Sequence, residues 1–195
     1  MKEKTKKIIN TTFLLLFVGS IIIGFSIGGV VNLGDSSSNV QKYGSLKFTK
    51  KGNLWSTYIN NKEAQFIYYP TDVTDLVLDG ETISLLTNKY EIDATSGFND
   101  TLKESIAYSE YELGNMMKFH FSSYLRAGYT ENNTYNMPII TCNQSSQIVP
   151  VIYFVYGNET KITREGTCII ANAKSSNDMI RIKDRLLYAM LGILK

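Results

Sequence analysis

The stretch IINTTFLLLFVGSIIIGFSIGGVV, residues 8–31, decides the architecture of this chain because its 24 residues include no charged side chain. As a helix it would extend about 36 Å, enough to cross a hydrocarbon core of about 30 Å with some tilt. A helix of this length in a water-soluble domain carries a polar face, and this stretch has none. The sequence therefore predicts one transmembrane helix, with the rest of the chain on either side of it.

Positive charge in front of this stretch predicts its orientation. Residues 1–7 hold four lysines and one glutamate. By the positive-inside rule this basic tail stays in the cytoplasm and residues 32–195 are exported. The apolar run is longer than the core of a cleaved signal peptide, and no A-x-A-like cleavage site follows it. We therefore expect a single-pass signal anchor that is retained in the cell membrane, with an extracytoplasmic C-terminal part.

Small residues recur at every fourth position within the predicted span, at Ser20, Gly24 and Gly28. This spacing places them on one helix face, where a second helix can approach closely, and is compatible with a homodimer within the membrane. The alternative is that these residues reflect only the general frequency of glycine in membrane helices.

The exported part divides into a stalk and one domain. Residues 32–45 are small and polar, which predicts a flexible stalk, and residues 46–195 have the length of a single domain with its own core. Residues 32–195 carry 16 Lys and Arg against 17 Asp and Glu. This near balance argues against nucleic acid or an anionic membrane surface as the main ligand, since both attract a basic excess.

The pattern of apolar residues predicts an α+β domain, with a mainly antiparallel sheet packed against two principal helices. The helices are Thr101–Lys118, opened by a capping box over Thr101–Glu104, and Ser176–Leu194, whose apolar stripe indicates a core helix. The clearest hairpin joins Ile148–Tyr156 to Lys161–Ala171. The other predicted strands are Leu46–Lys50, Leu54–Ile59, Ala64–Tyr69, Ile83–Thr87, Tyr90–Ile92, Phe119–Tyr129 and Met137–Cys142.

Two cysteines, Cys142 and Cys168, lie in the exported part. An even count in an oxidising compartment predicts one disulfide, which would join the start of the predicted hairpin region to its end. The alternative is a shared metal site, which would need two more soft ligands in a chain with one histidine.

Four N-x-S/T triplets, the acceptor pattern for N-glycosylation, also fall in the exported part. Their turn-like surroundings are of the kind that tolerates a glycan, so they are candidate glycosylation sites and agree with export. The asparagines are Asn99, Asn132, Asn143 and Asn158.

Candidate catalytic and metal-binding residues are few. His120, the one histidine, lies among aromatic residues in a predicted strand and is interpreted as structural. Asp72, Asp75, Asp79 and Glu81 gather around a turn, but their spacing matches no calcium loop. We expect a solvated turn there, and we predict no catalytic residue, no metal site and no cofactor.

Seven short motifs are distributed along the predicted exported part. They are Asn53–Trp55, Tyr69–Pro70, Pro150–Ile152, Asn158–Thr160, Cys168–Ile170, Asp184–Tyr188 and Gly192–Ile193. In these motifs the chain resembles a group of small uncharacterised archaeal membrane-anchored proteins, and the resemblance covers most of the exported part. It implies an archaeal cell-envelope setting and a pairing of Cys142 with Cys168. It implies no catalytic activity.

Three functions are compatible with this sequence, and we favour the first. It is a non-enzymatic envelope protein that binds another envelope protein or a surface polymer, because no catalytic or phosphate-binding motif is present. The second is a surface hydrolase that uses a pair of carboxylates, chosen from Asp72, Asp75, Asp79, Glu91 and Asp93. The third is an accessory component of a pilus or secretion system, although the processing site of pilin-like proteins is missing.

Overall fold

A computed structural model describes residues 39–195, which form one compact unit. The predicted cytoplasmic tail, the predicted span at 8–31, the small residues Ser20, Gly24 and Gly28, and the first part of the stalk lie outside the described residues. Among residues 39–195, no helix is long and apolar enough to cross a membrane. The domain is an α+β fold, as the sequence predicts, but it contains two sheets where we expected one.

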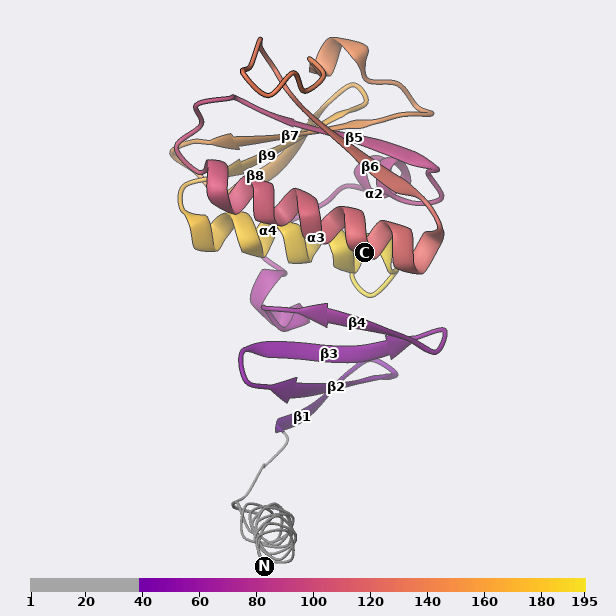
Figure 1. The fold of residues 1–195 in the computed structure, drawn as a ribbon. Helices are drawn as coiled ribbons and strands as arrows, with labels where there is room; N and C mark the ends of the chain where they lie inside the picture. Colours follow the sequence, from indigo (N-terminus) through magenta and orange to yellow (C-terminus); the bar gives the residue numbers. More distant parts are fainter. Residues whose placement is uncertain (1–38) are drawn as a thin grey trace, which may run out of the picture. The chain divides into compact units, whose positions relative to one another are not determined.

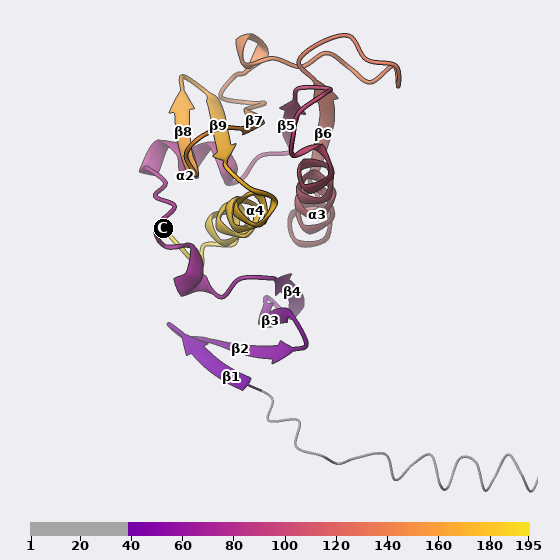
Figure 2. The same cartoon turned by 90° about the vertical axis from the view of Figure 1, so that its left-hand side faces the viewer.

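Three layers make up the domain (Figures 1 and 2): a four-stranded sheet, a middle layer of two long helices, and a five-stranded sheet. The helices of the middle layer are α3 (Lys103–Phe121) and α4 (Ser176–Met190). Both were predicted, with boundaries that differ by a few residues. A single apolar core runs through all three layers, because buried residues of both sheets pack against α4.

The four-stranded sheet is an antiparallel meander in the order β1-β2-β3-β4. It confirms the three predicted strands and adds β1 in the region predicted as stalk. That prediction was wrong from residue 39 onward because an edge strand buries little and its sequence can therefore be polar. The strands are β1 (Asn39–Tyr43), β2 (Leu46–Lys51), β3 (Leu54–Ile59) and β4 (Lys62–Phe66).

The five-stranded sheet has the order β6-β5-β7-β9-β8 and is parallel except for β8. The expectation of a mainly antiparallel sheet therefore holds for the first sheet and fails for the second. Its strands are β5 (Glu91–Ser96), β6 (Tyr124–Tyr129), β7 (Val151–Tyr156), β8 (Lys161–Glu165) and β9 (Cys168–Ala173).

The predicted hairpin between Ile148–Tyr156 and Lys161–Ala171 is not formed. Strand β7 pairs in parallel with β9, and the hairpin is β8–β9, which turns at Gly166 with a φ of 61°. Because β7 is a central strand with a nearly continuous apolar run, covered on both faces, it behaves as parallel strands do. Strand β8 alternates between exposed and half-buried residues and takes the edge.

Helix α2 (Gly80–Leu86) occupies the predicted strand Ile83–Thr87. The strand prediction failed because Asp79 caps a helix there: its Oδ1 accepts a hydrogen bond from the Thr82 amide at 2.6 Å. The predicted strand Phe119–Tyr129 is also shorter than expected, because α3 continues to Phe121 before β6 begins.

Two further local predictions need correction. The capping box at Thr101–Glu104 is absent. Instead, Oδ1 of Asp100 accepts a hydrogen bond of 2.7 Å from the Leu102 amide at the start of α3. Met137–Cys142 is not a strand but part of a long crossover between β6 and β7, with one bridge from Ile139 to Tyr129. Two short 3-10 helices complete the fold, η1 (Pro70–Val73) and η2 (Cys142–Gln144).

Helix α4 lies between the two sheets, and for that reason it buries charged residues that would normally face water. Lys183, Asp184 and Arg185 are each at most 3% exposed. Asp184 pairs with Lys183 at 2.5 Å and accepts the backbone amides of Ile67 and Tyr68 at 2.9 and 2.8 Å. The Asp184 carboxylate is therefore hydrogen-bonded to the segment that follows β4. Such hydrogen bonds help to offset the cost of removing the two charges from water.

Candidate functional site

The edge of the five-stranded sheet where β5, β6 and β7 begin carries two hollows and a group of exposed apolar side chains. Because these strands are parallel, the segments that enter them meet at one edge, and α3 and α4 both end there. Those segments are Thr87–Tyr90 before β5, Ser122–Ser123 before β6 and Gln147–Pro150 before β7. Their positions are set by strand pairing that no local sequence pattern specifies.

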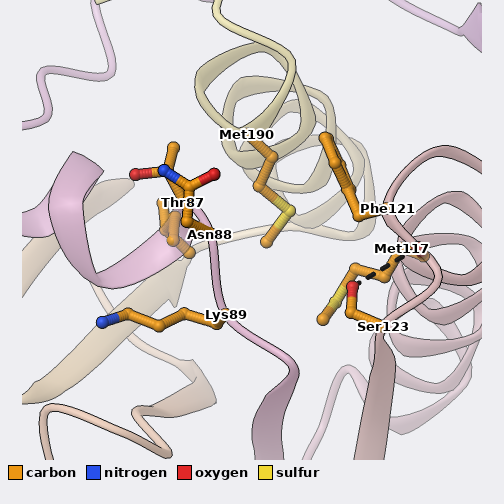
Figure 3. Close-up of a pocket in the computed structure, with 8 residues that line it drawn as sticks. Thr87, Asn88, Lys89, Met117, Phe121, Ser123 and Met190 are labelled. Atoms are coloured by element: carbon orange, nitrogen blue, oxygen red, sulfur yellow. Dashed lines mark hydrogen bonds between the residues drawn. The ribbon is translucent and has the colours of Figure 1, made fainter.

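A pocket of about 150 Å³ opens at this edge between the ends of α3 and α4. The sulfur-bearing side chains of Met117 and Met190 point into it from the two helices, with Phe121 beside them (Figure 3). The residues Thr87–Lys89 form the opposite wall. Methionine side chains adapt to ligands of irregular shape, so this pocket suits an inserted group that is apolar on one side and faces polar residues on the other.

A second hollow, of about 420 Å³, lies on the other side of Asn88 and Lys89, which line both. It is bounded by Tyr90 and Ile148. Lys89 donates from Nζ to the Gln147 carbonyl at 2.6 Å and so ties the entry to β5 to the entry to β7. We call the two hollows together the edge groove.

Exposed apolar side chains surround the edge groove. Tyr90 and Ile148 are 74% and 80% exposed, and Phe121 and Tyr124 are 45% and 41% exposed. The Tyr90 and Tyr124 rings pack edge to face, with centroids 5.4 Å apart. A cluster of exposed aromatic and aliphatic groups beside a pocket is typical of a protein interaction surface rather than of a solvated edge.

Glu91, which lines the second hollow, belongs to a charged cluster around Arg126 on β6. Its guanidinium binds Asp93 through two hydrogen bonds of 2.7 and 2.8 Å and lies 3.2 Å from Glu91. Tyr124 donates its hydroxyl to Glu91 at 2.5 Å. These hydrogen bonds raise the pKa of Arg126 further above its usual range, with the Asp93 bond as the main cause. The two carboxylates are therefore paired with a cation and are poor candidates for acid–base chemistry.

The remaining predicted acidic residues also have structural partners. Asp72 accepts the Tyr69 amide at 3.1 Å, and Asp75 pairs with Arg181 at 2.5 Å. Asp79 caps α2, and Glu81 pairs with Arg164. Between residues 39 and 195, no three His, Cys, Asp or Glu side chains converge as a metal site.

His120 lies in the last turn of α3 and not in the predicted strand. Its Nε2 is 3.1 Å from the Glu63 carbonyl oxygen, and burial lowers its pKa. Lys62 donates from Nζ to the Phe119 carbonyl at 2.7 Å and so caps the end of the helix. His120 thus joins α3 to β4, in agreement with the structural role that the sequence indicated.

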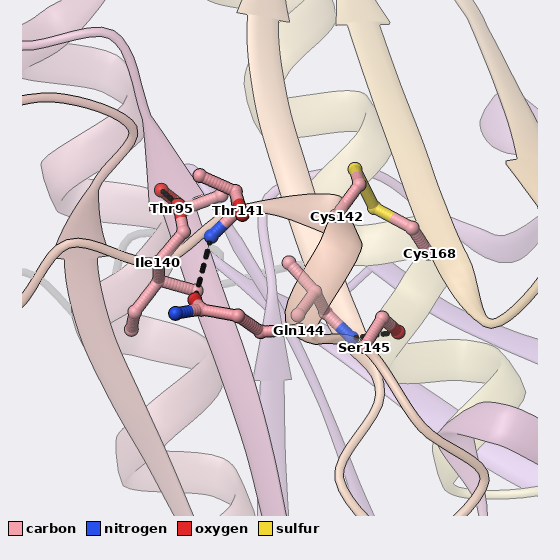
Figure 4. Close-up of a disulfide and its surroundings, with 8 residues drawn as sticks. Thr95, Ile140, Thr141, Cys142, Gln144, Ser145 and Cys168 are labelled. Carbon is pink, nitrogen blue, oxygen red and sulfur yellow. Dashed lines mark hydrogen bonds between the residues drawn. A yellow bond between two sulfur atoms is a disulfide. The ribbon is translucent and has the colours of Figure 1, made fainter.

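Cys142 and Cys168 form the predicted disulfide, with their Cα atoms 5.2 Å apart (Figure 4). The bond fixes η2 to the first residue of β9 and holds the long β6–β7 crossover over the face of the sheet that α3 and α4 do not cover. A small second core of Ile140, Val151 and Cys168 lies beneath it. The alternative of a shared metal site is therefore not realised.

The four asparagines of the N-x-S/T triplets are all exposed. Asn99, Asn132 and Asn158 follow the ends of β5, β6 and β7, so they lie at the edge opposite the edge groove. Asn143 lies in η2. The sequence named these residues, but it gave no indication that three of them share one edge.

No family model, no curated protein and no solved structure matches the chain. Sequence reasoning missed the residues that line the edge groove, since Met117 and Met190 fit an ordinary core stripe. No local sequence pattern marks them, since the exposure of Tyr90 and the φ of 57° at Asn88 are known only from the structure.

Proposed function

We propose that this protein is a membrane-anchored, extracytoplasmic component of an archaeal cell envelope that binds another envelope protein through the edge groove. The observation that carries this proposal is the exposed apolar rim around a methionine-lined pocket. Interfaces are enriched in aromatic residues and methionine, and their energy concentrates in side chains that enter such pockets. The anchor at 8–31 and the cytoplasmic N-terminus belong to the proposal on the grounds of sequence.

The arrangement of the candidate glycosylation sites also supports the edge groove as the binding surface. Three of the four exposed asparagines lie at the opposite edge of the sheet, and none lines the edge groove. Glycans at Asn99, Asn132 and Asn158 would leave the groove free for a protein partner. The groove favours a protein over a polymer, because its small pocket, with two methionine side chains on one wall, fits one inserted side chain.

Photo-crosslinking in native membranes tests this function. A benzophenone amino acid is placed at Phe121, on the rim of the groove, or at Tyr135, which is 70% exposed near the opposite edge. We expect a defined crosslinked product of one envelope protein from position 121 and none from position 135. Equal products from both positions, or none from position 121, would contradict a groove-specific partner.

A separate experiment tests the anchor. The full chain should stay in the membrane fraction after an alkaline wash and should keep Met1, and protease added outside intact cells should digest the domain. A chain that is released by the wash, or a mature protein that begins near Asp35, would refute the proposed signal anchor.

A further inference from the structure

Charge is segregated between the layers of the domain. The four-stranded sheet and its turns, residues 39–66, carry five lysines and one glutamate. Residues 67–195 carry 11 Lys and Arg against 15 Asp and Glu. The balanced total, which argues against an anionic surface as ligand, is therefore the sum of a basic sheet with a net charge of +4 and an acidic remainder with a net charge of −4.

Three of the five lysines lie on one face of the sheet, whereas Lys50 and Lys62 lie on its inner side, over the Trp55 ring and against the Phe119 carbonyl. Side chains of Phe48, Trp55 and Phe66 point toward α4 and are buried. The neighbouring residues along β1, β2 and β3 must point the other way, since side chains alternate along a strand. We call this outward surface the basic face; its residues are Val40, Lys42, Lys47, Thr49, Lys51, Leu54, Ser56 and Tyr58.

The basic face combines paired like charges with exposed apolar side chains, a combination that is unusual on a sheet that faces only water. Lys42 and Lys47 are direct cross-strand partners, and like charges in this position repel. Between the lysines, Val40, Leu54 and Tyr58 are 42%, 39% and 65% exposed. Cations interspersed with a tyrosine and aliphatic groups are characteristic of surfaces that meet lipid headgroups, where the rings and aliphatic groups enter the interface.

A shallow hollow of about 420 Å³ on this face supplies hydroxyl donors beside the cations. Lys47 and Lys51 line it together with Thr49, Ser56 and Tyr58. Glu63, the one acidic residue of residues 39–66, stands at its β4 side opposite Tyr58. Ammonium and hydroxyl groups around one hollow suit a phosphate group, which accepts hydrogen bonds from both.

We propose that the basic face docks on anionic phospholipid headgroups of the membrane in which the protein is anchored. This inference rests on the proposed signal anchor at 8–31. The chain between Val31 and Asn39 can reach at most about 30 Å when fully extended, so the anchor keeps this sheet close to the bilayer. Charge complementarity then selects the headgroups as the occupant, and each lysine near an anionic surface favours the docked state about fivefold.

Fluorescence quenching of the full chain in lipid nanodiscs tests the docking. A fluorophore is attached at Asn53→Cys, in the exposed turn between β2 and β3, or at Glu159→Cys, beyond β7, as the control. The nanodiscs contain phosphatidylcholine with or without phosphatidylglycerol, and a small fraction of lipid carries a quencher on its headgroup. We expect quenching at position 53 with phosphatidylglycerol only, its loss in 0.5 M salt, and none at position 159.

Charge reversal identifies the face. The variant K42E/K47E/K51E should lose the quenching at position 53, since three lysines together favour docking about 100-fold. The matched control K103E/K118E/K174E changes three exposed lysines outside the sheet and should keep it. The neutral variant K42Q/K47Q/K51Q should also lose the quenching. An unchanged unfolding transition in each variant shows that the loss does not come from misfolding. Unchanged quenching in both Lys42–Lys51 variants, or no quenching at position 53 in anionic nanodiscs, would overturn the proposal.

Further outcomes distinguish failure of the lipid docking from failure of the signal anchor, and distinguish lipid from an anionic polymer as the ligand. Loss of every chain from nanodiscs in an alkaline wash would refute the anchor and the docking with it, whereas retention without quenching would refute the docking alone. If soluble polyglutamate binds the domain but lipid does not quench the label at position 53, the occupant is an anionic polymer and the lipid proposal fails.

Discussion

Replacement of Glu110 by glutamine should remove a pH dependence of the stability of the domain. Glu110 lies on α3, and its Oε1 is buried without a hydrogen-bond partner among the described residues. Burial raises the pKa of this carboxyl from 4.5 to about 7. Tyr129 lies near it: burial, and secondarily the Glu110 carboxylate, raises the pKa of that phenol.

The sign and magnitude follow from this shift. In the unfolded chain Glu110 loses its proton near pH 4.5, whereas the folded protein holds the proton until about pH 7. The folded state therefore binds more protons in this window, and stability falls as the pH rises through it. At 1.36 kcal/mol per pKa unit, the loss is about 3 kcal/mol by pH 8.

Urea unfolding of wild type and Glu110→Gln at pH 4.5 and pH 8 measures this effect. Trp55, the single tryptophan, is buried and reports on the fold. We expect the two proteins to have similar stability at pH 4.5 and the glutamine variant to be more stable by about 3 kcal/mol at pH 8. His120, whose pKa is lowered, contributes with the opposite sign and cancels in the difference. The same pH dependence in both proteins would refute the reasoning.

Three further predictions concern the fold. Cys142→Ser, Cys168→Ser and the double variant should each lose about 3.5 kcal/mol of stability, because they open the same loop; two reactive thiols in the unreduced, unfolded wild type would contradict this. Asp184→Asn should cost about 3–5 kcal/mol in urea unfolding, since it leaves a buried lysine unpaired, and a cost below about 1 kcal/mol would exclude a buried charge there. Gly128→Ala should destabilise the domain, because a Cβ would lie 2.5 Å from the Pro138 carbonyl oxygen. An unchanged melting temperature would contradict this and would mean that the β6–β7 crossover can move away at no cost.

Local sequence patterns determined the elements whose signals are short in range. The meander over residues 46–66 followed from turn residues such as Asn60 and Asn61, both at positive φ. The two long helices followed from apolar spacing, and the disulfide followed from an even cysteine count in a domain predicted to be exported. Each of these features depends on neighbours along the chain or on chain-wide composition, and both can be read without a fold.

Pairing over long distances was decided only by the tertiary structure. The run at β7 could have paired with β8 or with β9, and the choice of a parallel partner depends on burial on both faces. Lys183 and Asp184 resemble surface charges in the sequence, yet a layer on each side of α4 buries them. The same stacking brings Met117 and Met190 together at the edge groove.

The distribution of charge shows the same division between sequence and structure. The sequence determined that residues 32–195 are nearly neutral, because net charge is a sum that ignores position. Only the tertiary structure places Lys42, Lys47 and Lys51 on one outward face, since strand pairing aligns residues from two strands and alternation turns them to the same side. A sum of charges cannot contain that information, because it depends on which residues the fold makes neighbours.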